Sequence, residues 1–130
     1  MTEQHLPSDP VAAACLGRDA VEVAAAHQFA DEDPAHEQFY DYGRELVATL
    51  NALDDLTVTL TSQVARYGEH RLLRDDTGAD PNQRLAIARG HLAELHTALT
   101  TAAGHANQFW STIGHIGVEV DPHAPGDDQQ

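Results

Sequence analysis

The chain has 130 residues, enough for one folded domain with a modest core. Its 21 acidic residues against 7 basic ones give a formal net charge of -14, so most of its surface repels nucleic-acid phosphates and anionic membranes. We therefore expect neither general nucleic-acid binding nor membrane binding. All basic residues are arginine, and Ala, Asp, His and Gly are abundant, which is typical of a GC-rich bacterial genome.

The N-terminal third predicts a disordered segment at 1–9 and two short helices, at about 10–16 and 20–30. Asp9-Pro10 suits a helix start, because Asp accepts free N–H groups and Pro fits the first helical position. Gly17 separates the two helices, and Asp19 with Glu22 forms a capping box that restarts the second. Cys15 is the only cysteine, which excludes an internal disulfide and favours a reducing cytoplasm. We expect it to be a small buried residue.

Two long helices follow, predicted at 34–73 and 81–116, each opened by an Asp-Pro pair. Apolar residues in the second recur in alternating steps of three and four, as in a coiled coil. They are Leu85, Ala88, Leu92, Leu95, Leu99, Ala102, Ala106, Phe109, Ile113 and Ile116. The first helix has two matching sets, Phe39, Leu46, Leu53, Leu60 and Tyr67, and Gly43, Leu50, Thr57, Val64 and Arg71. Residues 56–64 alternate with period two and are rich in β-branched residues, so a strand is the alternative there.

The link at 74–80 contains a glycine and a new N-cap, so the two helices are expected to form a long antiparallel hairpin. The predicted fold is an all-α, coiled-coil-like helical bundle, a single domain over 10–120 with a disordered tail at 121–130. No run reaches the ~18 apolar residues of a membrane span. An isolated hairpin buries too little apolar surface. Either the N-terminal helices cover it, or a second copy forms a homodimer, or another protein binds.

The open end of the hairpin is expected to gather aromatic residues. Folding the chain about residue 77 or 78 pairs Phe39 with Ile116 and Leu46 with Phe109, so that Tyr42 and Trp110 lie nearby. Phe109 belongs to the heptad pattern, whereas Trp110 flanks it and would cover a third helix or a partner. Phe39, Tyr42 and Trp110 are therefore candidate partner-binding residues, the alternative being a packed aromatic end to the bundle.

The nine histidines raise the question of a metal site. His91 and Glu94 share a helix face, but no second pair lies opposite them in the hairpin alignment. His36, Glu37, Asp41 and His115 could also meet at the open end. We predict solvated histidines, with neither metal nor cofactor. Nucleophile motifs and a glycine-rich phosphate loop are absent from the sequence, so we predict that the chain is not an enzyme.

The tip of the hairpin is the one region that is not acidic. Residues 66–89 hold five arginines and four acidic residues, whereas residues 1–65 hold twelve acidic residues and two arginines. Arg71 and Arg74 are candidate contacts to an acidic or phosphate-bearing partner. A long helical hairpin with an acidic loop resembles the coiled coil of bacterial transcript-cleavage factors, whose tip carboxylates reach into RNA polymerase. The other motifs and the second domain of that family are missing here.

These observations favour a cytoplasmic, non-enzymatic interaction or assembly module that forms a homodimer or binds a partner protein through helical faces and the aromatic end. One alternative is a regulator that contacts nucleic acid or the transcription machinery through the arginine-bearing tip. Another is a histidine-rich bundle that binds a metal or small ligand.

Overall fold

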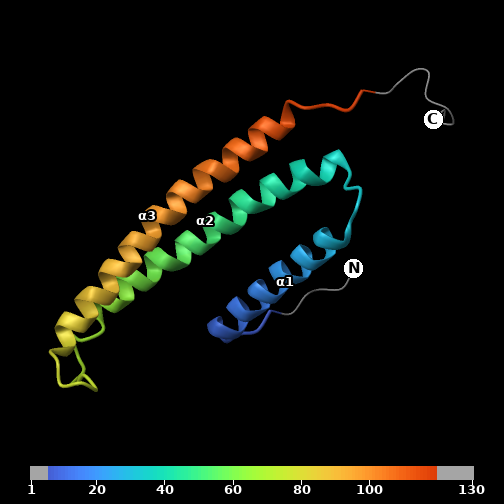
Figure 1. Ribbon diagram of the computed structural model, residues 1–130. Helices are drawn as coiled ribbons and strands as arrows, with labels where there is room; N and C mark the ends of the chain where they lie inside the picture. Colours follow the sequence, from blue (N-terminus) through green and yellow to red (C-terminus); the bar gives the residue numbers. More distant parts are fainter. Residues whose placement is uncertain (1–5, 120–130) are drawn as a thin grey trace. The chain divides into compact units, whose positions relative to one another are not determined.

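A computed structural model describes residues 6–119 and shows three helices: α1 (Pro10–Ala30), α2 (His36–Arg66) and α3 (Pro81–Gly114) (Figure 1). No strand occurs among these residues, so the prediction of an all-α fold is confirmed. The chain divides into two compact units, one up to Ala35 and one from His36 onward. The predicted disordered tail at 121–130, and residues 1–5 of the predicted disordered N-terminus, lie outside the described residues.

α1 is one continuous helix of 21 residues, so the predicted break at Gly17 is wrong. A glycine inside a helix costs only about 1 kcal/mol, less than forming a second pair of helix ends with unbonded backbone groups. Asp9 caps the helix, its carboxylate accepting from the Val11 N–H at 3.2 Å. The carboxylate of Asp19 instead pairs with Arg18 at 3.0 Å. Cys15 is exposed, contrary to the expected burial.

α2 begins at His36, two residues later than predicted. The Asp31 N–H donates to the Gln28 carbonyl at 3.2 Å and ends α1, while the Asp31 carboxylate accepts from the Asp33 N–H at 3.1 Å. These bonds hold the chain in a turn before it re-enters a helix. The strand alternative at 56–64 is also excluded, because that segment lies within α2.

The helix α2 ends at Arg66 rather than at 73. The Tyr67 N–H bonds the Val64 carbonyl and the Glu69 N–H bonds the Arg66 carbonyl, each three residues back, which tightens the chain out of the α-helix. Gly68 then passes close to α3, where an added Cβ would lie 3.3 Å from Asn82 Oδ1. The link to α3 therefore starts seven residues earlier than expected and spans 67–80.

α2 and α3 pack side by side along their length (Figure 1). The contacts pair Gly43 with Trp110 near the start of α2, Asp54 with His96 midway, and Gly68 with Leu85 near the link. Residue numbers fall on α3 as they rise on α2, so the two helices run in opposite directions. The core between them is thin: among the described residues only Gly43, Thr57 and Ala106 are buried, and Ala106 still keeps 9% of its surface exposed.

Candidate interaction surfaces

The surfaces of α2 and α3 are best described by heptad columns, meaning residues seven apart that lie on one side of a helix. α2 turns two columns toward α3, both buried or half-buried: Gly43, Leu50, Thr57 and Val64, and Val47, Asp54, Thr61 and Gly68. The first column is one of the two predicted. The second is not the predicted leucine column but the column one residue further along the helix, which contains an acid and a glycine. On α3 the facing column is Leu85, Leu92, Leu99, Ala106 and Ile113, all buried or half-buried.

The leucines assigned by sequence to the contact are instead exposed. Along α2 and into the link this column contains Leu46, Leu53, Leu60 and Tyr67, and along α3 and just past its end the equivalent column contains Leu95, Phe109 and Ile116, with 39 to 52% of each residue exposed. Ala88 is exposed and Ala102 half-exposed in the same α3 column. Each helix thus buries one of its two predicted apolar columns and leaves the other uncovered.

The two uncovered columns lie on one face of the helix pair. In both helices the exposed column lies three residues after the buried column. Because α2 and α3 run in opposite directions, a residue three positions after the contact points to the same side of the pair on either helix. Beside each exposed column runs one more that also contains no acidic residue. We call the whole surface the apolar face: Leu46, Leu53, Leu60, Tyr42, Thr49, Leu56 and Gln63 on α2 with Tyr67 just past its end, and Ala88, Leu95, Ala102 and Phe109 with Arg84, His91, Ala98 and His105 on α3.

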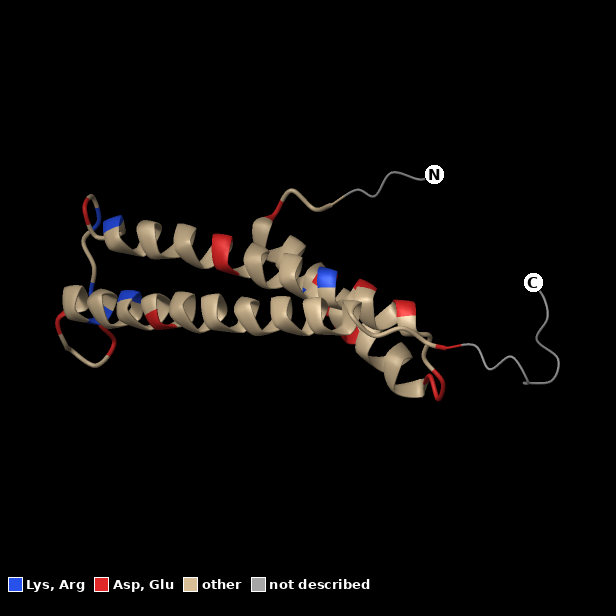
Figure 2. Cartoon of the chain, turned by 90° about the horizontal axis from the view of Figure 1, so that it is seen from above, with Lys and Arg blue, Asp and Glu red and all other residues tan. Residues whose placement is uncertain are grey.

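The apolar face contains no acidic residue although the chain carries a net charge of -14. Its one charged residue is Arg84, whose guanidinium Nε lies 2.8 Å from the Asp75 carboxylate. The acidic residues of α2 lie in other columns, and Figure 2 shows acidic positions both at the start of α2 and midway along it. A large contiguous exposed apolar surface is unusual on a monomeric protein and is typical of an interaction site.

The open end of the α2–α3 pair is built on a close contact between backbones. Trp110 lies against Gly43, and its ring is 5.7 Å from that of Tyr40 at an angle of 57°. Its Nε1 is buried and has no hydrogen-bond partner among the described residues. The expected roles are therefore exchanged: Trp110 packs between the helices, whereas Phe109 is 40% exposed on the apolar face. Of the other aromatic candidates, Phe39 and Tyr42 are half-buried.

The other face at this end bears a shallow open groove. It is lined by Tyr40, Asn107, Trp110, Ser111, Gly114 and His115. Tyr40 covers Gly114, where an added Cβ would lie 3.1 Å from the ring. At the open end the aromatic side chains of Tyr40 and Trp110 therefore pack between the helices, and polar residues line only the groove beside them.

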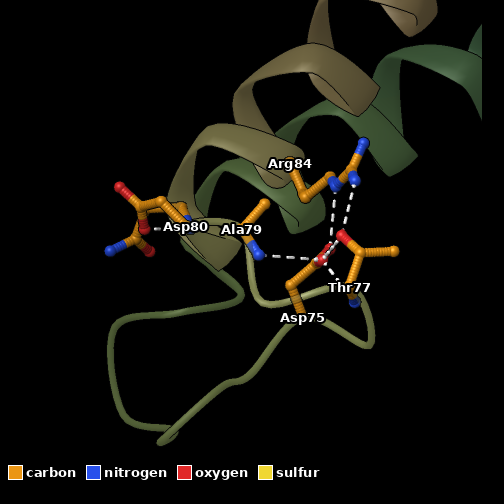
Figure 3. Close-up of polar contacts among 6 residues, drawn as sticks. Asp75, Thr77, Ala79, Asp80 and Arg84 are labelled. Carbon is orange, nitrogen blue, oxygen red and sulfur yellow. Dashed lines mark hydrogen bonds and ion pairs between the residues drawn. The ribbon is translucent and has the colours of Figure 1, made fainter.

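The link is organised around the carboxylate of Asp75, whose side chain is only 8% exposed (Figure 3). It accepts hydrogen bonds from the Thr77 hydroxyl and, at 2.8 and 3.2 Å, from the Thr77 and Ala79 N–H groups. The hydrogen bond from the Thr77 hydroxyl, helped by the Thr77 N–H and the Arg84 guanidinium, holds the pKa of Asp75 far below its usual value. Asp80 then caps α3 by accepting from the Asn82 N–H at 3.0 Å.

The remaining arginines of the tip have no carboxylate partner within residues 6–119. Arg71 stacks over the Tyr67 ring at 4.3 Å and donates to the Tyr67 carbonyl at 3.1 Å. Arg74 is exposed in the link, and Arg66 and Arg89 are exposed on the flanking helices. The structure therefore brings the two predicted candidates, Arg71 and Arg74, into one basic region but not into one pocket.

The histidines do not gather into a cluster. In the part of the chain described, no three His, Cys, Asp or Glu side chains lie close enough to hold a metal ion together. The one prominent histidine contact joins α2 to α3, where His96 Nδ1 lies 2.6 Å from Asp54 Oδ1. The sequence does not predict this pair, because Asp54 belongs to neither of the two columns expected at the contact.

Comparison with protein-family models, curated proteins and solved structures finds no match to this chain. Among the helices of residues 6–119, none has the length and apolar character needed to span a membrane.

Proposed function

We propose that this protein is a non-enzymatic assembly module that self-associates through the apolar face. The observation that supports the proposal is the uncovered column of leucines on α2 beside a matching column on α3, both free of acidic residues. Covering them completes the coiled-coil-like bundle that the heptad pattern predicts, with four helices in a homodimer.

The energetic reason is the hydrophobic effect acting on side chains that are already ordered. Leu46, Leu53 and Leu60 sit on a formed helix, so burying them gains free energy without ordering further backbone. Because the surface lacks carboxylates, two chains of net charge -14 can approach through it without placing like charges in contact.

Light scattering over a concentration series tests this function. The chain is expected to show twice its mass of 14.1 kDa, and the double variant Leu53→Glu/Leu60→Glu is expected to be a monomer. Both leucines are exposed in the single copy, so the variant should keep its helical circular dichroism. Val58→Glu/Ala65→Glu is the matched control, with the same spacing on another exposed column of α2. A monomeric parent chain, or equal loss of association in both variants, would refute the proposal.

The protein is proposed to act in the cytoplasm, where its single exposed cysteine stays reduced. A heterologous protein presenting an uncharged helical face is the second kind of partner that the apolar face fits.

Two alternatives from the sequence remain predictions. A regulator that contacts nucleic acid through the tip would show salt-sensitive binding that weakens when Arg71 and Arg74 are changed to alanine. A metal-binding bundle would show a thermal shift with zinc that is lost when His91 is changed to alanine.

A further inference from the structure

We infer that the partner of the apolar face is a second copy of this chain in antiparallel orientation, with the arginine-bearing tip of one copy beside the acidic start of α2 in the other. The inference rests on the proposed self-association and adds the orientation and a binding partner for the tip. Two orientations bring the apolar faces of two identical chains together around a twofold axis. In the parallel one, like ends of the two copies meet. In the antiparallel one, α2 lies on the partner's α2 and α3 on the partner's α3, with opposite ends meeting.

Charge favours the antiparallel orientation. The start of α2 carries Glu37, Asp41 and Glu45, with Arg44 between them, whereas the tip carries arginines that have no carboxylate partner within the described residues. Residues 66–89 of the tip hold five arginines and four acidic residues, so the main electrostatic cost of a parallel dimer is that it places the two acidic ends together. The antiparallel dimer pairs opposite charges at both ends, which lowers the free energy of association and suppresses the alternative.

The two oppositely charged residues that the antiparallel dimer would bring together, Glu45 and Arg66, belong to one heptad column of α2. Glu45 and Arg66 are three heptads apart on α2, in the column that borders the apolar face. Their midpoint lies beside Leu56, as does the midpoint of Leu53 and Leu60. A twofold axis near Leu56 therefore stacks Leu53 on the partner's Leu60 and brings Glu45 beside the partner's Arg66.

The volumes of the side chains on the apolar face also favour the antiparallel orientation. Counting from the Gly43–Trp110 contact, Leu46 lies near the level of Phe109 at one end of the face, and Tyr67 near the level of Ala88 at the other. A parallel dimer would crowd two phenylalanines into one layer. The antiparallel dimer puts each bulky Phe109 layer on the layer that contains the small Ala88, which keeps the packing density even.

Cysteine cross-linking tests the orientation. In a Cys15→Ser background, Ala98→Cys lies at the midpoint of the α3 part of the apolar face, so an antiparallel dimer brings the two introduced thiols together across its axis. A disulfide needs Cα atoms within about 7 Å, which the parallel dimer does not allow because α3 then faces the partner's α2. We expect a covalent dimer on oxidation. Ala93→Cys, on another exposed side of the same helix, is the matched control and should remain unlinked.

Charge exchange provides a second test. Glu45→Arg is expected to weaken association about tenfold, because it faces Arg66 twice in the symmetric dimer, and Arg66→Glu added to the same chain is expected to restore it. A dimer by light scattering that neither cross-links through Ala98→Cys nor recovers in the double variant would overturn the antiparallel orientation while leaving self-association intact. A chain that is monomeric at all concentrations would overturn both.

Discussion

Gly43 of α2 lies directly against Trp110 of α3, so closely that a Cβ added to the glycine would sit 2.8 Å from the tryptophan Cβ and 2.9 Å from its Cα. At this distance the two backbones touch, and only glycine fits. The contact brings α2 and α3 together near their open end.

Gly43→Ala is therefore expected to lower the free energy of unfolding by about 1–3 kcal/mol, although alanine is the better helix former. Thermal unfolding followed by circular dichroism measures the change. Gly104→Ala on α3 is the matched control, because nothing lies within 4 Å of its added Cβ. That variant is expected to gain up to about 1 kcal/mol from helix propensity. Equal effects at the two positions would contradict the close contact.

Thr57 is 4% exposed between the helices, and its hydroxyl donates to the Leu53 carbonyl at 2.9 Å. Thr57→Ser keeps the hydroxyl and removes a buried methyl group, so we expect a loss of about 1 kcal/mol in denaturant unfolding. The same change at the exposed Thr59 should stay within about 0.5 kcal/mol. A neutral result at Thr57 would mean that its methyl group is not packed.

The His96–Asp54 hydrogen bond connects α3 to α2 midway along the pair, with the Asp54 side chain 22% exposed. A double-mutant cycle with Asp54→Ala and His96→Ala is expected to give a coupling energy of about 0.5–1.5 kcal/mol. Asp54→Ala combined with His105→Ala is the control, because no contact joins those two side chains and their effects should add. Additive effects at Asp54 and His96 would show that the bond contributes nothing to stability.

The lowered pKa of Asp75 links the folding of the tip to pH. A carboxyl group whose folded pKa is depressed contributes stability that is fully present above its unfolded pKa of about 3.9 and is lost as the pH falls toward the folded value. Asp75→Asn should therefore destabilise the protein at pH 7, and the difference from the parent chain should shrink at pH 3. Chemical unfolding at the two pH values measures this. Asp76→Asn, which alters an exposed neighbour, is the control for removing one carboxylate from the tip.

Part of this architecture could be predicted from periodicity alone. The all-α class, the caps at Asp9 and Asp80 and the Gly43 and Leu85 columns follow from N-cap chemistry and heptad spacing. The heptad spacing also predicts the exposed apolar columns, Leu46 to Tyr67 and Ala88 to Ile116. What spacing does not specify is which column meets which neighbour, because two adjacent columns on a helix differ by only a fraction of a turn.

The errors share a physical cause. The Leu46 column is predicted at the contact between α2 and α3, but the column that contains Asp54 and Gly68 lies there, because close backbone approach and a hydrogen bond to His96 can replace apolar packing. Just past the end of α2 at Arg66, Gly68 passes close to Asn82 of α3, a tertiary approach that local sequence does not reveal. Gly17 predicts a helix break, but α1 continues through it, because a single glycine destabilises a helix only slightly.

The single tryptophan and the single cysteine also have a spectroscopic consequence. Trp110 belongs to the unit from His36 onward, and the exposed Cys15 belongs to the unit that ends at Ala35. Intrinsic fluorescence therefore has one tryptophan emitter, and a thiol-reactive acceptor dye has one attachment point. Energy transfer from Trp110 to a dye on Cys15 would report the separation of the two units in the unmodified sequence, and mixing labelled with unlabelled chains would separate transfer within a chain from transfer between chains.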